Sequence, residues 1–260
     1  MLHLLQKDPR LQRVMEVLEE PAHELWKNVS GTGLDMLHAS YEDPSRYSYL
    51  FQSYVFITRF LLHNSPARRS KPAVLVTERS VSTDRIVFLE ALLEQGFLDE
   101  PEAEAYETWY NAVVRALPNI LADSFIYLRA SPSVCYERLK RRAGSEEARV
   151  GLDYLQLLHR KHEDWFVQRT SAIAGHGDKG GGSLRVIDNL RIPSGVQGRQ
   201  VLVVDCNLNL NLAEKSPERD ALVDQIVEFL LSQLSQSALG LNLELAQLLI
   251  NSESHGEGHL

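Results

Sequence analysis

The sequence predicts an α/β fold in which helices flank a mainly parallel central sheet. Short apolar runs, typical of strands buried on both faces, alternate with longer segments of helical periodicity. The chain has 260 residues, of which 44% are hydrophobic, and this is enough to enclose a substantial core. Such alternation indicates a layered α/β protein, because consecutive parallel strands are joined by crossover helices.

The predicted helices carry apolar residues at helical spacing, and two of them begin with a strong start signal. Asp43-Pro44 and Ser131-Pro132 each place a capping side chain before a proline at the first helical position. The leucines near the amino terminus also recur at helical spacing, whereas residues 14–18 fit either a helix or a strand. We expect further helices at about residues 44–63, 83–94, 102–117, 132–142, 152–166 and 217–234.

Three apolar runs predict buried strands at residues 73–77, 124–128 and 201–204. The glycine-rich stretch 175–182 has a different character. No strand precedes it, no Gly-Lys-Ser/Thr follows, and no helix opens after it, so it does not fit a phosphate-binding loop. We therefore interpret residues 172–199 as a flexible surface insertion.

The composition argues against several classes of protein. With 27 Lys and Arg against 35 Asp and Glu, the net charge is −8, which disfavours non-specific nucleic-acid binding. An anionic ligand would therefore need a local basic cluster. No apolar run approaches the roughly 18 residues needed to cross a membrane. Cys135 and Cys206 lack metal-type spacing, which suits a reducing compartment.

Charged residues follow two of the predicted strands. Glu78 and Arg79 come directly after residues 73–77, with Asp84 one turn into the next helix. Arg138 and Arg142 end the helix that follows the second strand. Ligands of open α/β sheets bind at the carboxyl ends of strands, so a polyphosphate site is one interpretation. The alternative is a solvated strand end, with cations favoured at a helix carboxyl terminus by the helix dipole.

One predicted helix carries a polar pair on a single face. Gln52 and Arg59 are seven residues apart, close to two helical turns, and Phe51 and Tyr54 flank this face. An amide and a guanidinium between aromatic rings could read a flat heterocycle. The alternative is the polar edge of an amphipathic helix. Glu20, which precedes a proline, indicates little by itself.

Several short motifs occur in a specific order over about residues 3–232. They are Glu20-Pro21 with Trp26, Phe51-Gln52-Ser53-Tyr54, Glu78-Arg79-Ser80 with Asp84-Arg85, Phe125-Ile126-Tyr127-Leu128 with Ser131-Pro132, Arg138 and Arg142 with Glu146-Glu147, Tyr154-Leu155, His159, His162-Glu163 with Trp165, and Val203-Val204-Asp205. This order resembles the deoxyribonucleoside kinase family, and the residues within the motifs are similar to those of plant members. The resemblance implies a P-loop kinase-like three-layer fold that transfers the γ-phosphate of ATP, with Mg²⁺, to the 5′-hydroxyl of a deoxynucleoside in nucleotide salvage.

The resemblance also implies a role for individual residues. Glu20 would be the general base for the 5′-hydroxyl, Arg79 would stabilise the transferring phosphoryl group, and Glu78 would help to hold Mg²⁺. The other implied contacts are Gln52, Arg59 and Asp84 with the base edge, Phe51 and Phe88 with the base faces, Tyr41 and Glu147 with the 3′-hydroxyl, Arg138 and Arg142 with the ATP phosphates, and Asp205 near the adenine of ATP. Equivalents of Arg59 and Asp84 are generally replaced in thymidine-selective members, so deoxyguanosine, deoxyadenosine or deoxycytidine is favoured here.

The sequence departs from the family pattern in three places. One extra residue precedes Trp26, and Gly144 stands where many members have a further lid arginine. Family members also begin with a strand and a glycine-rich lysine loop, whereas residues 1–5 resemble the helix after that loop. We therefore expect a kinase domain at 1–235 without its first strand and P-loop, with an exposed sheet edge and impaired ATP binding, and a tail at 236–260.

Two other functions are alternatives to the kinase. A non-catalytic kinase-like structural or partner subunit would not need Glu20, Glu78 and Arg79 together. A nucleic-acid-binding module conflicts with the net charge. The family resemblance implies a homodimer through the helices at 44–63 and 102–117, deoxynucleoside and ATP as ligands, no nucleic acid or membrane partner, and a cytoplasmic or mitochondrial location.

Overall fold

The computed structural model describes residues 1–20, 25–64, 72–142, 150–173, 182–187, 196–208, 212 and 214–253, with the backbone alone for residues 30, 182 and 238–253. By their internal contacts, the residues divide into two compact units. One comprises residues 1–16, 72–75 and 211–260, and the other comprises residues 17–71 and 76–210. Every described residue of the predicted site lies in the second unit.

The regular elements follow one another in the alternating order that the sequence predicts. The α-helices are α1 (Leu2–Lys7), α2 (Met36–Glu42), α3 (Pro44–His63), α4 (Val81–Thr83), α5 (Glu90–Glu94), α6 (Glu100–Ala116), α7 (Pro132–Arg142), α8 (Leu152–Glu163) and α9 (Pro217–Glu253). The strands are β1 (Met15–Leu18), β2 (Val74–Thr77), β3 (Ser124–Arg129), β4 (Thr170–Ala172), β5 (Gly182–Ile187) and β6 (Gln200–Asp205). Short 3-10 turns lie at Val29–Gly31 and Pro118–Ile120, and π-helical segments at Asp84–Leu89 and Asp164–Gln168.

The helix start signals work as the sequence predicts. The side chain of Asp43 accepts a hydrogen bond from the Arg46 N–H and sets the beginning of α3. Helix α6 begins with a capping box in which Asp99 and Glu102 bond each other's backbone N–H groups. The ambiguous segment 14–18 is strand β1 rather than helix.

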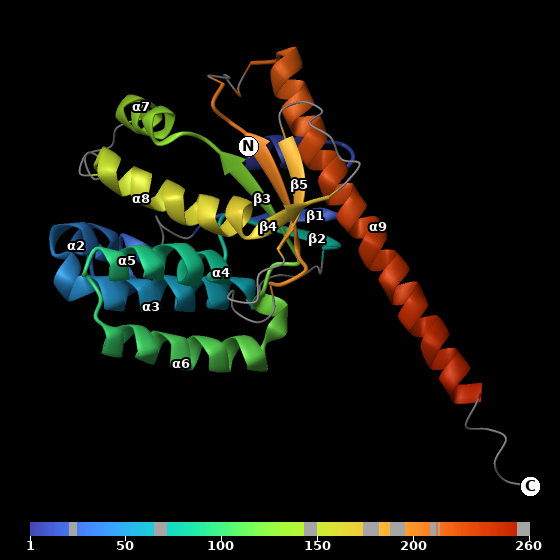
Figure 1. The fold of residues 1–260 in the computed structure, drawn as a ribbon, viewed down its shortest axis with the longest axis horizontal. Helices are drawn as coiled ribbons and strands as arrows, with labels where there is room; N and C mark the ends of the chain where they lie inside the picture. The colour runs from blue at the N-terminus through green and yellow to red at the C-terminus, as the bar shows by residue number, and fades with distance from the viewer. Residues whose placement is uncertain are drawn as a thin grey trace, which may run out of the picture. The chain divides into compact units, whose positions relative to one another are not determined.

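The described strands form two sheets. In the four-stranded sheet, β3 and β6 are parallel, whereas β5 runs antiparallel to both β6 and β4, giving the order β3-β6-β5-β4 (Figure 1). The second sheet pairs β1 with β2. The Val74 N–H donates to the Val14 carbonyl and the Glu78 N–H to the Leu18 carbonyl, so these strands are parallel. The α/β class is confirmed, with mixed rather than mainly parallel sheets.

Burial differs between two strands that the sequence predicts to be alike. All four residues at 201–204 in β6 are buried, as expected for a strand between two neighbours. In β2, by contrast, no residue is fully buried, and the expectation of a strand enclosed on both faces is wrong there. Among the described residues, β2 pairs with β1 alone, so no strand is hydrogen-bonded to its other edge.

Aromatic side chains hold the helices of the second unit together. Phe56 of α3 meets Trp109 of α6 with ring centroids 4.7 Å apart, and Phe125 of β3 meets Trp165 at 5.1 Å. Helix α3 also packs against the π-helical segment Asp84–Leu89, and α8 packs against α5 and α7. The segment that begins at Asp84 is therefore fixed between α3 and α8.

Two sequence predictions need correction at the carboxyl-terminal half. The predicted flexible insertion contains strand β5, whose pairing with β6 the sequence did not reveal; residues 174–181 and 188–195 lie outside the described part. Helix α9 continues to Glu253 instead of ending near residue 234, since no proline interrupts the sequence after it. In the first unit, Arg10 donates to Asp224 of α9 at 2.6 Å. No helix in the described ranges has the length and apolarity of a membrane span.

Candidate active site

The parallel pairing of β1 and β2 brings two charged strand ends together. Glu20 follows β1, and Glu78 and Arg79 follow β2. The two strands are parallel, so all three residues lie at the end of this sheet where the strands have their carboxyl ends. The Nη1 atom of Arg79 donates to both carboxylate oxygens of Glu20, at 2.9 and 3.0 Å. This places Glu20 and Arg79 side by side, as their implied roles as base and phosphoryl-stabilising cation require.

Arg79 has an unusual backbone conformation. Its φ angle is +60°, in the left-handed region that a residue with a Cβ adopts at a cost of roughly 1–3 kcal/mol. Thr77 supports this turn by donating from its hydroxyl to the Arg79 carbonyl at 2.8 Å. The guanidinium lies 5.1 Å from the centre of the Phe88 ring. The fold therefore holds a strained residue whose side chain reaches Glu20.

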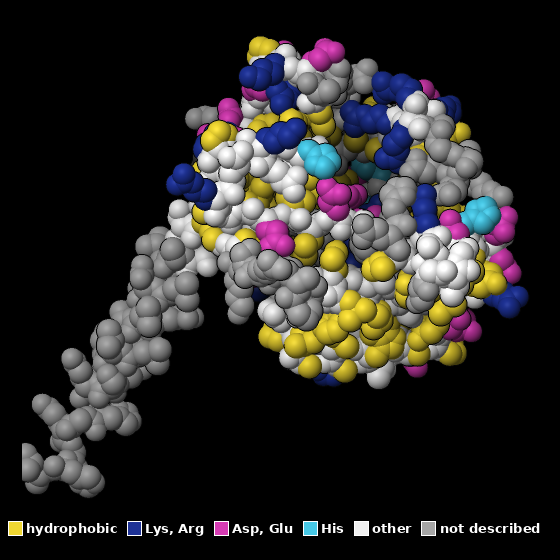
Figure 2. All heavy atoms as spheres, turned by 180° about the vertical axis from the view of Figure 1, so that it is seen from behind, with side chains coloured by type: hydrophobic (Ala, Val, Ile, Leu, Met, Phe, Trp, Pro, Cys, Tyr) yellow, Lys and Arg dark blue, Asp and Glu magenta, His cyan; other side chains and the backbone are white. Residues whose placement is uncertain are grey.

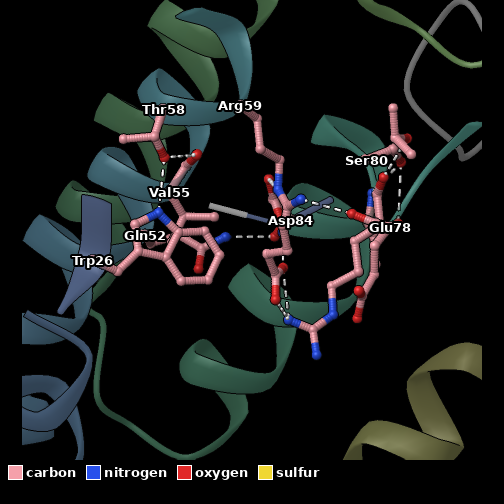
Figure 3. A network of polar contacts seen from close by, with 12 residues as sticks. Trp26, Gln52, Val55, Thr58, Arg59, Glu78, Ser80 and Asp84 are labelled. Carbon is pink, nitrogen blue, oxygen red and sulfur yellow. Dashed lines mark hydrogen bonds and ion pairs between the residues drawn. The ribbon is translucent and has the colours of Figure 1, made fainter. Parts of the chain in front are cut away.

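Arg59 connects the remaining charged groups. From helix α3 its Nε donates to Asp84 at 2.9 Å and its Nη1 donates to the Glu78 carbonyl at 2.8 Å (Figure 3). Its Nη2 donates to Glu20. The Arg59 side chain is only 9% exposed. A guanidinium that is so little exposed to solvent needs these hydrogen-bond partners, because an unpaired buried charge is strongly unfavourable.

The position of Arg59 is fixed from behind by Trp26. The Trp26 ring lies 5.6 Å from the guanidinium carbon, and its Nε1 donates to Thr58 at 2.9 Å (Figure 3). Phe51 packs edge-to-face on Trp26 with the ring centroids 5.6 Å apart. Trp26 therefore supports Arg59 directly, and Phe51, which the sequence places beside the polar pair, supports it through Trp26.

Asp84 is the buried acid of the cluster. Its side chain is 1% exposed, and burial raises its pKa to about 6, an effect that Arg59 and Arg79 partly oppose. Gln52 donates to the Asp84 carbonyl at 2.7 Å, so the predicted base-reading residues Gln52, Arg59 and Asp84 form one contiguous group. Asp84 begins a π-helical segment, a feature often found at functional sites.

Helix α8 supplies neighbours to which the sequence assigned no role. Burial raises the pKa of Tyr154, and the charge of Arg79 opposes this shift while Tyr41 adds to it. Burial likewise lowers the pKa of His162, and Arg79 lowers it further; the Nδ1–H of His162 donates to the Leu158 carbonyl at 2.7 Å. Tyr154 and His162 therefore lie within electrostatic range of Arg79. Both residues belong to the motifs that carry the family resemblance, and this was the sequence signal that could have pointed to them.

The predicted ATP-binding residues are arranged differently. Arg138 donates to the carbonyls of Cys206 and Leu208, at 2.7 and 2.9 Å, and so joins α7 to the segment after β6. Asp205 accepts two hydrogen bonds from Asn207, both at 2.8 Å. Arg142 is exposed at the end of α7, and a shallow depression beside this helix is lined by Ser133, Val134, Glu137, Arg141 and Asn207.

Two remaining predictions concern the sugar and the metal. Tyr41 is 36% exposed on α2, whereas Glu147 and the departure at Gly144 lie outside the described residues. Glu78 is exposed, and no group of three or more metal-type side chains occurs within the described ranges. A lone carboxylate still fits Mg²⁺, which usually combines one or two carboxylates with substrate phosphates. Figure 2 shows acidic and histidine side chains at a hollow that Lys and Arg side chains surround.

Comparisons with known proteins identify the family of the chain. The profile of the family described as "Deoxynucleoside kinase" matches residues 2–231. Deoxycytidine kinase from Rattus norvegicus is 32% identical over 233 residues, which cover 83% of this chain and 80% of the relative. Mitochondrial deoxyguanosine kinase from Xenopus laevis is 33% identical over 165 residues, or 57% and 62% of the two chains. Mitochondrial thymidine kinase 2 from Homo sapiens is 34% identical over 154 residues, or 59% and 56%.

The extent of these matches varies. The chain spans less than two thirds of the length of several of the relatives it matches, including 62% of the Xenopus laevis protein and 60% of a probable deoxycytidine kinase from Fowlpox virus. The residues that match the family profile include every described residue of the cluster around Glu20 and Arg59.

Proposed function

Because the chain belongs to the deoxynucleoside kinase family, we propose that it transfers the γ-phosphate of ATP to the 5′-hydroxyl of a deoxynucleoside. One observation carries the proposal: the Glu20 carboxylate contacts the guanidinium groups of both Arg59 and Arg79 at the strand edge. A hydroxyl bound at Glu20 would lie next to a base that accepts its proton and a cation that compensates phosphoryl charge.

The acceptor half of the reaction uses the residues at this edge. Glu20 takes the proton of the 5′-hydroxyl, and Arg79 stabilises the charge on the transferring group. Glu78 helps to hold Mg²⁺, which supplies charge neutralisation on the donor phosphates when it is bound. Tyr41 and Glu147 hold the 3′-hydroxyl of the sugar.

The base is read by the buried polar group on α3 and at Asp84. Gln52, Arg59 and Asp84 face the base edge, while Phe51 and Phe88 pack on its faces. This set favours deoxyguanosine, deoxyadenosine or deoxycytidine over thymidine. The names of the relatives do not identify the preferred deoxynucleoside, because one of these relatives is a thymidine kinase.

The donor half involves the carboxyl ends of β3 and β6. Arg142, together with Arg138, approaches the ATP phosphates, and Asp205 lies near the adenine. The kinase domain extends over residues 1–235, followed by the carboxyl-terminal segment. We place the protein in the cytoplasm or the mitochondrion.

A homodimer through α3 and α6 forms part of the proposal. Leu50, Ile57 and Leu61 are 44–57% exposed and recur at helical spacing on α3. Figure 2 shows hydrophobic side chains gathered at the height that α3 and α6 occupy in Figure 1. Sedimentation of the Leu61→Lys variant should then give a monomer where the unchanged protein gives a dimer.

The test measures binding and turnover separately, because the 260 residues contain no glycine-rich lysine loop. Calorimetric titration should give tighter binding of deoxyguanosine, deoxyadenosine or deoxycytidine than of thymidine, by tenfold or more. Phosphoryl transfer is assayed on this chain and on the longest product of its gene. Binding without transfer in both would favour a kinase-like partner subunit, and absence of any deoxynucleoside binding would refute the proposed function.

A further inference from the structure

The Arg59 guanidinium joins two groups to which the proposed function gives different tasks. Its Nε donates to Asp84, which reads the base, and its Nη2 donates to Glu20, which accepts the proton. Both contacts are present in the structure. The same cation therefore touches both the recognition group and the general base.

In this arrangement Glu20 has little capacity left for a substrate hydroxyl. Oε1 accepts from Arg59 and from Arg79, and Oε2 accepts from Arg79. A carboxylate offers about four lone-pair positions, so these bonds occupy three of them. A 5′-hydroxyl that donates to Glu20 must compete with two guanidinium groups.

We propose that binding of the nucleobase draws Arg59 away from Glu20, so that recognition of the base releases the general base for catalysis. This inference rests on the proposed function and deepens it. Arg59 thereby acts on the reacting hydroxyl through Glu20, as a positioning residue, in addition to reading the base. The identity of the base then affects turnover as well as affinity.

The geometry allows this exchange with a small movement. A small rotation of the whole guanidinium in its own plane would move Nη2 from Glu20 toward an acceptor on the base, and would lengthen the bonds of Nε to Asp84 and of Nη1 to the Glu78 carbonyl. The Trp26 ring, 5.6 Å from the guanidinium carbon, covers one face and favours movement in the plane of the group. Arginine has five N–H donors in a rigid planar fork, which suits one bond given up for another.

The exchange requires a base that presents an acceptor to Arg59. Cytosine and the purines can offer Arg59 a ring nitrogen with a free lone pair, whereas thymine can offer only its carbonyl oxygens, at different positions on the ring. A base without a suitable acceptor would fill the site and leave Arg59 on Glu20. Such a nucleoside would bind and yet be phosphorylated slowly.

The first experiment measures affinity with a probe that cannot touch Glu20. 2′,5′-Dideoxycytidine lacks the 5′-hydroxyl, so Glu20 affects its binding only by competing for Arg59. Titration calorimetry should show that Glu20→Gln binds this probe at least threefold more tightly than the unchanged protein. In the Arg59→Met background the same substitution should have no effect. Glu19→Gln, at the exposed residue next to Glu20, is the matched control and should leave affinity for the probe unchanged.

The second experiment keeps the proposal testable if Arg59→Met weakens the probe beyond measurement. Methyl 2-deoxyriboside has the reacting hydroxyl and no base. Arg59→Met should phosphorylate it at least threefold faster than the unchanged protein, whereas a purely base-reading Arg59 predicts no gain. Unchanged or weaker probe binding by Glu20→Gln would overturn the inference, and so would the absence of a rate gain with the base-free sugar. In either case the proposed function stands as long as the unchanged protein binds a deoxynucleoside. If the unchanged protein binds no deoxynucleoside, both fail.

Discussion

The two sides of the proposed reaction centre are built in different ways. On the acceptor side, Glu20, Arg59 and Asp84 are 13%, 9% and 1% exposed and bond directly to one another. On the donor side, Arg142 is exposed, and the hydrogen bonds that the structure gives Arg138 run to backbone carbonyls. Among the described residues, the side proposed to bind the nucleoside is thus more closely bonded than the side proposed to bind the donor phosphates.

This difference follows from the physical cost of each arrangement. Buried charges persist only when they are paired, so packing of α3 against the π-helical segment fixes their geometry. Ion pairs between exposed groups contribute little to stability, because solvent screens them. Substitutions on the acceptor side should therefore change both catalysis and stability, and those on the donor side should separate the two.

The largest expected effect is the loss of the general base. Glu20→Gln keeps the shape of the side chain and removes its ability to accept a proton, so turnover should fall by about 10²–10⁴-fold. Initial-rate assays of deoxyguanosine phosphorylation would measure this. The exposed neighbour Glu19, changed to Gln, serves as the control and should retain turnover. Loss of affinity with turnover preserved would show that Glu20 only binds substrate.

Next in size is a change in the preferred base. Arg59→Met combined with Asp84→Ala removes the buried ion pair together, which avoids leaving either charge unpaired. The ratio of kcat/KM for thymidine to that for deoxycytidine should rise at least tenfold. An unchanged ranking of the four deoxynucleosides would refute the base-reading role of this pair.

A smaller effect should distinguish two arginines of α7. Arg138→Ala removes hydrogen bonds to the Cys206 and Leu208 carbonyls, so it should destabilise the protein by about 1–3 kcal/mol. Arg142→Ala should raise the KM for ATP severalfold while the melting temperature stays within a degree or two. Denaturant unfolding and ATP titration on the same preparations provide the measurements, and the reverse pattern would contradict the assignment.

The last expected effect is a dependence of stability on pH. Burial raises the pKa of Asp84 from 3.8 to about 6, so Asp84 binds a proton more readily in the folded protein than in the unfolded chain. The stability this gives is complete below about pH 4 and is lost as the pH rises through about 6, a change on the order of 3 kcal/mol. Urea unfolding of the unchanged protein and of Asp84→Asn, compared from pH 4 to 7, should show this difference.

The same titration should affect ligand binding in the opposite direction. Below about pH 6, Asp84 becomes protonated and its ion pair with Arg59 weakens. Deoxyguanosine affinity should therefore fall several-fold between about pH 7 and pH 5. Asp84→Asn, which cannot titrate, should show a flat profile over this range; a matching fall in that variant would assign the effect to another group.

Local signals made much of the fold predictable. Helix α3 begins and ends at the predicted residues because Asp43 and Pro44 mark its start and its apolar residues keep helical spacing. Strand β6 is buried as its apolar run predicts. Strands β4 and β5 were missed, because both are short, mixed in character and adjacent to glycine-rich sequence. Strand β5 is also held by β6 through a pairing that short sequence windows do not contain.

The site shows the same division between local and non-local information. The motifs predicted Gln52, Arg59 and Asp84 as one recognition group, and the structure brings them together. The contact between Arg59 and Glu20 was not predicted, because it joins residues 39 positions apart through tertiary packing. The positive φ of Arg79 was equally hidden, since arginine carries no sequence signal for the left-handed region.

The most direct test of the acceptor site is a crystal structure of the protein with deoxycytidine. The account predicts the 5′-oxygen within hydrogen-bond distance of the Glu20 carboxylate and the base edge facing Gln52, Arg59 and Asp84. A nucleoside bound only in the depression beside α7, or with its base directed away from Asp84, would contradict it.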